Sequence, residues 1–213
     1  MIGKTAGVDE AGRGPVFGPM VVACVTAPSE RLGIGARDSK KLTPAARRRL
    51  VRRIMSDPRL SVDVEIVWPW EIDREGVAEA EFRAVASLVR RCGARRVILD
   101  KPGNYDDETL LRKLRPPEGV EIIAEERADD RYEVVSAASI VAKTYRDWIV
   151  ENLERLHGPV GSGYPTDPKT IERLEREISE DGPLHDMFRR SWSTYRRVER
   201  KVSTKTLDEF LRG

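Results

Sequence analysis

The sequence predicts an α/β fold, because short apolar runs alternate with segments of helical periodicity along most of its 213 residues. Five runs have the length of a strand, and residues 20–26 are almost continuously apolar, as in a strand buried on both faces. Two other runs lead directly into carboxylates, at Asp9-Glu10 and at Asp100. Open α/β sheets bind ligands at the carboxyl ends of their strands, so these carboxylates are candidate site residues.

The first half of the chain supplies most of these elements. Residues 4–8, 20–26 and 62–68 read as strands. Thr43 followed by Pro44 is an N-cap with proline at the first helical position, which predicts a helix to about Met55, before Pro58. A second helix is expected at residues 75–91, where an apolar stripe precedes a stop at Gly93.

The second half continues the alternation. We expect strands at 95–99 and 120–124, a short helix at 107–114, and a long helix at about 133–156 whose apolar residues keep helical spacing. A charged segment, residues 125–132, is expected as a loop before that helix. Residues 161–168 form a loop by composition, and the pattern from Pro168 to Arg200 is helical.

Composition excludes several classes of protein. The two cysteines form no C-x-x-C motif, and neither a phosphate-binding Walker loop nor a dinucleotide fingerprint is present. No run approaches the length of a membrane span, and the N-terminus has no signal core, so we expect a soluble cytoplasmic protein without membrane contact. The net charge is only +2, so any nucleic-acid contact must come from a local basic patch.

The stretch from Gly7 to Pro15 is the strongest candidate site. Neighbouring residues of a strand point to opposite faces, so Asp9 and Glu10 would diverge unless the strand ends there and the chain turns. Gly12 and Gly14 permit such a turn and a close approach to a ligand, and Arg13 offers donors for phosphate. The alternative is a surface turn with scattered charges.

Four carboxylates are expected to converge if the first and fourth strands are neighbours. Asp9, Glu10 and Asp100 would meet at one edge of the sheet, and Asp129 could join them from the start of the following helix. Such a group repels itself unless a hard cation binds, and oxygen ligands of this kind suit Mg²⁺ or Mn²⁺. Two such ions form the clamp used for phosphoryl displacement.

Two later segments fit a nucleic-acid surface. Tyr164 stands on a glycine-rich loop and could stack on a sugar or base, the alternative being a half-buried tyrosine in a turn. The most basic part of the chain interleaves arginines with Trp192 and Tyr195; the alternative is a solvated helix face with its aromatic residues in the core. The basic residues are Arg189, Arg190, Arg196, Arg197, Arg200 and Lys201.

Five motifs in one order give the chain a family resemblance. They are D-E-A-G-R-G-P from Asp9, D-S-K-K-L from Asp38, the strand ending at Asp100, A-D-D-R-Y-E-V-V-S-A-A-S-I-V-A-K from Ala128, and G-S-G-Y-P-T-D-P from Gly161. Together they closely resemble ribonuclease HII, the type 2 ribonuclease H, and most of all its archaeal branch.

The resemblance implies the ribonuclease H fold, with a five-stranded mixed sheet flanked by helices and a C-terminal helical extension. It divides the chain into a catalytic domain (1–160), a substrate-binding extension (161–203) and a tail (204–213). It also implies an endonuclease that hydrolyses the RNA strand of RNA–DNA hybrids and cuts on the 5′ side of single ribonucleotides in duplex DNA. The products carry 3′-hydroxyl and 5′-phosphate ends, and the roles would be ribonucleotide excision repair and RNA primer removal.

The same resemblance assigns residues. Asp9, Glu10, Asp100 and Asp129 would be the catalytic carboxylates and the ligands of two Mg²⁺ or Mn²⁺ ions, with Asp129 rather than Asp130 at the family position. Other residues would bind the substrate. The Gly12–Gly14 turn would sense the 2′-hydroxyl, and Tyr164 would pack on the sugar 3′ of the ribonucleotide. The remaining substrate-binding residues would contact phosphates or support the site. These substrate-binding residues are Gly12, Arg13, Gly14, Lys40, Ser139, Lys143, Tyr164 and Thr166.

The last residues resemble the peptide that binds the sliding clamp PCNA. Leu207, Phe210 and Leu211 would enter a hydrophobic pocket of the clamp, although Thr204 replaces the usual glutamine. The alternative is a short amphipathic end that packs on its own domain. We otherwise expect a monomer.

Two other functions stay open on the sequence alone. Another nuclease of the same fold, such as a junction resolvase, would cut junctions that contain no ribonucleotide. A silent hybrid-binding protein or clamp adaptor would bind without cleavage and without metal.

Overall fold

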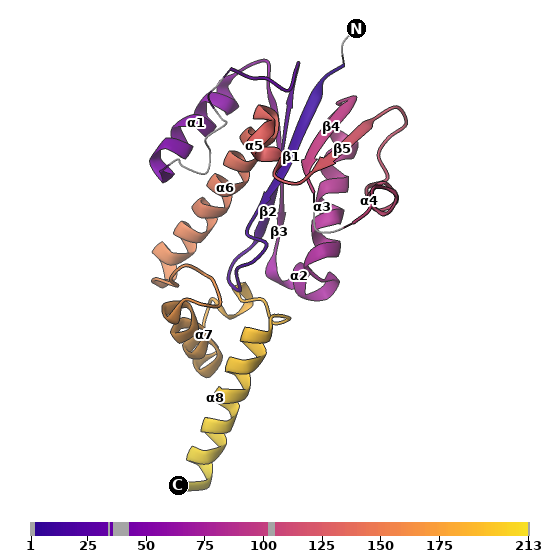
Figure 1. Ribbon diagram of the computed structural model, residues 1–213. Coiled ribbons are helices and arrows are strands. Elements are labelled where there is room, and N and C mark those ends of the chain that lie inside the picture. Colours follow the sequence, from indigo (N-terminus) through magenta and orange to yellow (C-terminus); the bar gives the residue numbers. More distant parts are fainter. Residues whose placement is uncertain (1–2, 34, 36–42, 102–104, 213) are drawn as a thin grey trace.

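The computed structural model describes residues 3–33, 35, 43–101 and 105–212, and side chains as far as residue 204. One mixed sheet crosses the centre of the molecule (Figure 1) in the order β3-β2-β1-β4-β5. The β1–β2 and β2–β3 pairs are antiparallel, whereas the β1–β4 and β4–β5 pairs are parallel. The strands are β1 (Thr5–Ala11), β2 (Met20–Ala27), β3 (Ser61–Val67), β4 (Arg96–Asp100) and β5 (Glu121–Glu125). The predicted five-stranded mixed sheet is confirmed.

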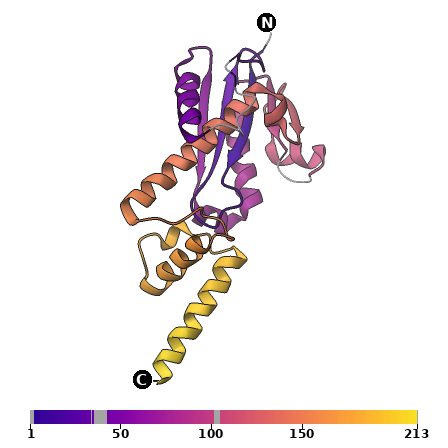
Figure 2. The ribbon, with the colours of Figure 1, turned by 60° about the vertical axis from the view of Figure 1, so that its left-hand side comes forward.

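Helices cover both faces of the sheet. In Figures 1 and 2, α1, α5 and α6 lie on one face, α2, α3 and α4 lie on the other, and α7 and α8 extend beyond one end. The helices are α1 (Pro44–Ser56), α2 (Pro69–Glu75), α3 (Val77–Arg91), α4 (Asp107–Leu114), α5 (Ala128–Arg131), α6 (Glu133–His157), α7 (Pro168–Glu180) and α8 (Ser193–Arg212), with a 3₁₀ turn at His185–Met187.

Each face of the sheet has its own apolar core. β2 is buried along its whole length, as its continuous apolar sequence predicts. Its residues alternate between the two cores: Val21, Ala23 and Val25 pack toward α6, whereas Met20 and Val22 pack toward α3. The sheet is therefore a central layer between two helical layers, and the ends of its strands are the places where polar groups can gather.

Local sequence explains where several helices begin. The hydroxyl of Thr43 accepts a hydrogen bond from the Ala46 amide at 3.3 Å, which confirms the predicted cap of α1. Asp106 and Asp167 cap α4 and α7 in the same way, through the amides of Thr109 and Lys169. Three of the helices thus start at a side-chain acceptor that is readable in the sequence.

Some predicted boundaries were wrong. The helix expected at 75–91 begins after Gly76, whose φ of 81° separates it from α2, a helix that the sequence analysis missed. The charged segment expected as a loop contains the short helix α5. The single helical pattern from Pro168 to Arg200 is two helices, because Asp181 ends α7 in a left-handed conformation.

A third apolar cluster joins the C-terminal helices to the rest of the molecule. Val16 and Phe17, which follow β1, pack with Leu174, Leu184 and Phe188. The rings of Phe17 and Phe188 lie 4.9 Å apart, and an isolated β-bridge links the same two residues. The C-terminal helices are therefore packed on the segment that follows the acidic end of β1. In the part of the chain that the structure describes, no helix combines the length and the apolar character needed to cross a membrane.

Candidate active site

The acidic pair lies within β1 and not in the turn after it. Asp9 and Glu10 pair with Ala23 and Val22 of β2, and the strand continues to Ala11. The expectation that the strand ends before the carboxylates was therefore wrong: pairing with β2 holds the backbone extended, and the turn begins at Gly12. The two side chains consequently point to opposite faces, Asp9 toward α6 and Glu10 toward α3.

Asp9 is buried against α6, where a serine and a lysine support it. Its side chain is hydrogen-bonded to Ser139 and to the Glu10 amide, the latter at 2.8 Å. Lys143 Nζ in turn donates to Ser139 Oγ at 2.7 Å. Burial, followed by repulsion from Glu10, raises the pKa of Asp9 well above its ordinary value. Ser139 and Lys143 thus lie beside the candidate site, where they orient one carboxylate.

Glu10 faces a second acidic group on the other side of the sheet. Burial, followed by repulsion from Glu81 of α3 and Asp100 of β4, raises the pKa of Glu10 to about 7. Asp100 therefore lies near the acidic pair, as the parallel pairing of Val8 with Leu99 requires. The condition for the carboxylates to converge, that the first and fourth strands are neighbours, is therefore met.

The fourth carboxylate is brought in by a backbone hydrogen bond. The Ala128 amide donates to Asp100 Oδ1 at 3.1 Å, which fixes the start of α5 at the end of β4. Asp129, the next residue, is 4% exposed. Asp130 is exposed instead, and its Oδ2 pairs with Arg127 Nη2 at 2.8 Å. Burial beside Asp100 therefore favours Asp129 over Asp130 as the site residue.

The sequence analysis missed Glu81, a carboxylate that is 1% exposed on α3. Its Oε2 lies 3.1 Å from Nε of Arg13, and burial raises its pKa, with Asp9 and Asp100 repelling it further. The only signal in the sequence was an acidic residue next to the apolar stripe of a helix. Its partner cannot be read there, because Arg13 is 68 positions away along the chain.

The Gly-Arg-Gly turn and the glycine-rich loop lie together. The amides of Val16 and Phe17 both donate to the Gly163 carbonyl, at 2.8 and 3.3 Å. A Cβ added to Gly14 would lie 3.5 Å from Cε1 of Tyr164, whose side chain is 48% exposed. The structure thus places an accessible aromatic ring beside the turn that follows the acidic strand.

The remaining predicted residues are placed as follows. Thr166 is exposed on the loop before α7. Tyr195 is buried and Trp192 is half-buried, as the alternative of a solvated helix face expects. The basic residues on α8 are exposed, namely Arg196, Arg197, Arg200 and Lys201. Arg189 is fully buried and so is not part of a basic surface. Lys40 and the side chains of Leu207, Phe210 and Leu211 lie outside the described residues.

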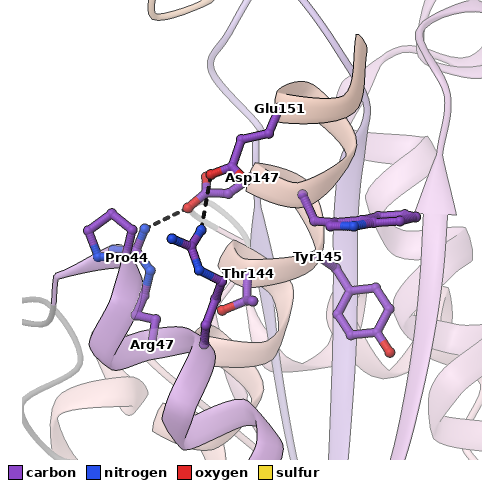
Figure 3. Close-up of a pocket in the computed structure, with 8 residues that line it drawn as sticks. Pro44, Arg47, Thr144, Tyr145, Asp147 and Glu151 are labelled. Atoms are coloured by element: carbon purple, nitrogen blue, oxygen red, sulfur yellow. Dashed lines mark hydrogen bonds and ion pairs between the residues drawn. The ribbon is translucent and has the colours of Figure 1, made fainter. Parts of the chain in front are cut away.

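A surface pocket lies elsewhere, between α1 and α6 (Figure 3). The arginines on its α1 side are paired: Arg47 Nη2 lies 2.5 Å from Asp147 Oδ2, and Arg48 Nη1 lies 3.2 Å from Glu151 Oε1. None of the four carboxylates lines this pocket. It is therefore separate from the candidate active site.

The carboxylates at the ends of β1 and β4 and at the start of α5 offer the oxygen donors that hard cations prefer. Among the residues that the structure describes, no three acidic, histidine or cysteine side chains already form a set of metal ligands. Burial and repulsion between carboxylates raise the pKa values of Asp9 and Glu10, and a cation bound beside them would favour their ionised forms.

Comparison with known proteins identifies the family of this chain. The family model described as Ribonuclease HII matches residues 6–195. Ribonuclease HII of Methanopyrus kandleri is 66% identical over 204 residues, which cover 96% of this chain and 97% of the relative.

Two solved structures are similar in fold and sequence. The ribonuclease H2 from Pyrococcus horikoshii OT3 has a TM-score of 0.85 and 36% identity, and the match covers 94% of this chain and 99% of that one. Ribonuclease HII from Archaeoglobus fulgidus, solved in complex with PCNA, has a TM-score of 0.78 and 35% identity, with 87% of this chain and 92% of that one covered. The five-stranded mixed sheet with its acidic edge is therefore a ribonuclease H-like fold, and the chain belongs to the ribonuclease HII family of endonucleases, which act on the RNA of RNA–DNA hybrids.

Proposed function

We propose that this protein hydrolyses the phosphodiester bond on the 5′ side of a ribonucleotide in duplex DNA, as well as the RNA strand of RNA–DNA hybrids, leaving 3′-hydroxyl and 5′-phosphate ends. The observation that carries the proposal is that a group of carboxylates lies next to a glycine turn with an exposed tyrosine beside it. A cluster of carboxylates occupies the end of β1 and β4, and the Gly12–Gly14 turn with Tyr164 follows directly after β1. The carboxylates suit metal-assisted hydrolysis, and the turn with Tyr164 suits recognition of a sugar.

The turn would recognise the ribose. A 2′-hydroxyl is the group that distinguishes RNA from DNA at a given site, and it can both donate and accept hydrogen bonds. Bare glycine backbone permits the close approach that this contact needs. Tyr164 would pack on the neighbouring sugar, which its exposure and its position beside Gly14 allow.

The four carboxylates would hold two Mg²⁺ or Mn²⁺ ions. Asp9, Glu10, Asp100 and Asp129 offer only oxygen donors, which hard cations prefer. Such ions, when bound, lower the pKa of the attacking water and stabilise the leaving 3′-oxygen. Lys143 and Ser139 would orient Asp9 and favour its ionised form against the effect of burial, because the serine hydroxyl that accepts from the lysine donates to the carboxylate. No covalent intermediate is needed, so positioning and charge neutralisation carry the rate.

The proposal predicts a cut at one position. A DNA duplex with a single ribonucleotide, incubated with Mg²⁺ or Mn²⁺, is expected to be cleaved on the 5′ side of that residue, whereas the all-DNA duplex stays intact. Sequencing gels and end-labelling identify the site and the terminal groups. Removal of the metal with EDTA should abolish cleavage, and re-addition should restore it. Cutting of a four-way DNA junction would instead favour a resolvase, and binding of the hybrid without cleavage at either metal would favour a binding module.

The C-terminal tail would bind the sliding clamp. The support is the sequence of residues 204–211 and the relative from Archaeoglobus fulgidus that was solved with PCNA. The backbone of α8 continues through this segment to Arg212 and extends away from the sheet (Figure 2), so the tail is accessible to a partner.

A pull-down tests the clamp contact. The full chain is expected to be retained on the clamp of the same organism, and the chain without residues 204–213 is expected to be lost. Phe210→Ala in the full chain should weaken retention by about 10-fold or more, since a buried aromatic anchor typically contributes at least 2 kcal/mol. Arg212→Ala serves as a control at the end of the same helix. Equal retention of the full and shortened chains would refute the contact.

A further inference from the structure

The Gly12–Gly14 turn is held by a buried arginine that comes from the C-terminal part of the chain. Arg189 is completely buried. Its Nη1 donates to the Arg13 carbonyl at 2.8 Å, and its Nη2 donates to the carbonyls of Gly12 at 2.5 Å and Gly18 at 3.0 Å. Its Nε also donates to Gly18, at 3.2 Å. The donors of one guanidinium thus gather three backbone carbonyls.

Trp192 supplies the hydrogen bond to the remaining carbonyl of the Gly12–Gly14 turn. Its indole Nε1 donates to the Gly14 carbonyl at 3.3 Å, and its ring lies 4.9 Å from the guanidinium carbon of Arg189. The carbonyls of Gly12, Arg13 and Gly14 therefore all accept hydrogen bonds from one short segment, residues 189–192. This segment lies more than 170 positions away from the turn along the chain.

Burial of the Arg189 guanidinium removes a charge from water, and an apolar side chain at this position would avoid that desolvation cost. Among the described residues, Arg189 takes part in no ion pair, and burial together with the charge of Arg146 lowers its pKa to about 9. A desolvated charge without a counter-ion is a poor way to stabilise a core, and an apolar side chain of similar volume would often serve better. The hydrogen bonds to the turn are what the guanidinium supplies and an apolar side chain would not.

The peptide geometry shows what these bonds do. In a trans peptide the C=O and the following N–H point in opposite directions. Because the carbonyls of Gly12 and Arg13 point to Arg189, the N–H groups of Arg13 and Gly14 point away from it, and neither donates to another group within the described chain. The side chain of Arg146 passes where a Cβ of Gly12 would lie, and it donates to the carbonyls of Phe17 and Pro19.

We propose that Arg189, aided by Trp192, is a positioning residue that directs the Arg13 and Gly14 amides toward the ribonucleotide and thereby sets the preference for a 2′-hydroxyl. The inference rests on the proposed function, because it assumes that this turn contacts the ribose. It assigns to the C-terminal extension an indirect role in specificity that is independent of its exposed basic residues.

Equilibrium binding in EDTA tests this role without catalysis. Fluorescence anisotropy compares the full-length protein on a labelled DNA duplex with one ribonucleotide and on the same duplex without it. The wild type is expected to prefer the ribonucleotide. Arg189→Lys keeps the charge but loses the planar fork of donors. We expect it to reduce the preference by about fivefold, the equivalent of one hydrogen bond, while its affinity for the all-DNA duplex stays the same.

Arg173→Lys is the matched control. Arg173 is a buried arginine of the same extension, but it binds Glu177 and the carbonyls of His157 and Pro159 and makes no contact with the turn. It should leave the preference unchanged even where it lowers the melting temperature. Should Arg189→Lys fail to fold, Trp192→Phe removes the donor to Gly14 and keeps an aromatic ring. The expected loss is about twofold, the low end for one hydrogen bond, because this bond is 3.3 Å long.

The outcomes are distinct. A wild-type preference that survives both Arg189→Lys and Trp192→Phe overturns the inference and leaves the proposed function intact. A loss of preference in Arg173→Lys equal to that in Arg189→Lys also overturns it, because the effect would then be general to the extension. No preference in a wild type that also fails to cleave would contradict the proposed function itself.

Discussion

Asp129→Asn is expected to reduce kcat/KM for cleavage at a single ribonucleotide by more than about 100-fold. Asparagine keeps the size and shape of the side chain but removes the negative charge that a divalent cation requires. Loss of a residue that merely supports a metal ligand already costs up to about 100-fold, so loss of a ligand should cost more. Initial rates at limiting substrate with Mg²⁺ and with Mn²⁺ measure the effect.

Asp130→Asn is the control beside it in the sequence. Asp130 is exposed, and its carboxylate pairs with Arg127. Its loss should change the rate less than about fivefold, since an exposed ion pair contributes at most about 1 kcal/mol. Thermal melts of both variants show whether the fold is kept. An inactive Asp130→Asn protein beside an active Asp129→Asn protein would reverse the assignment.

Gly7→Ala is expected to destabilise the fold by about 3 kcal/mol or more, at the upper end of the cost of overpacking. A Cβ at this position would overlap the backbone of Val134 and Val135, because β1 and α6 meet there without an intervening side chain. Backbone cannot rotate away as a side chain can, so α6 must shift from the sheet. The corresponding drop in melting temperature is about 6–12 °C for a chain of this size.

Gly119→Ala separates this clash from backbone strain. Gly119 has a φ of +76°, but a Cβ there would meet nothing within 4 Å. Alanine at such a position costs only about 1–2 kcal/mol, from the left-handed conformation alone. A melting temperature of Gly7→Ala equal to or above that of Gly119→Ala would show that α6 can move from β1 at little cost. Activity of Gly7→Ala should fall as well, because α6 carries Ser139 and Lys143 to the site.

The order of the elements, the class of the fold and four candidate carboxylates could all be read from the amino-acid sequence. Strand and helix periodicities, the Thr43 cap and the apolar runs of β2 and β4 are local properties, and local rules read them correctly. The same rules failed where the local pattern was ambiguous. The prediction ended β1 at Val8, where the apolar run ends, but pairing with β2 extends the strand to Ala11.

The contacts that assemble the candidate site depend on the packing of distant parts of the chain. It turned Asp9 toward Ser139 and Glu10 toward Glu81, and it brought Asp129 to Asp100 through the Ala128 amide. It also placed Arg189 on the carbonyls of the Gly12–Gly14 turn. These partners are far apart along the chain, and a buried charge or a backbone acceptor leaves no periodic signal in the sequence. Such contacts become definite only when the sheet and its helices pack, because packing selects which polar groups must satisfy one another away from water.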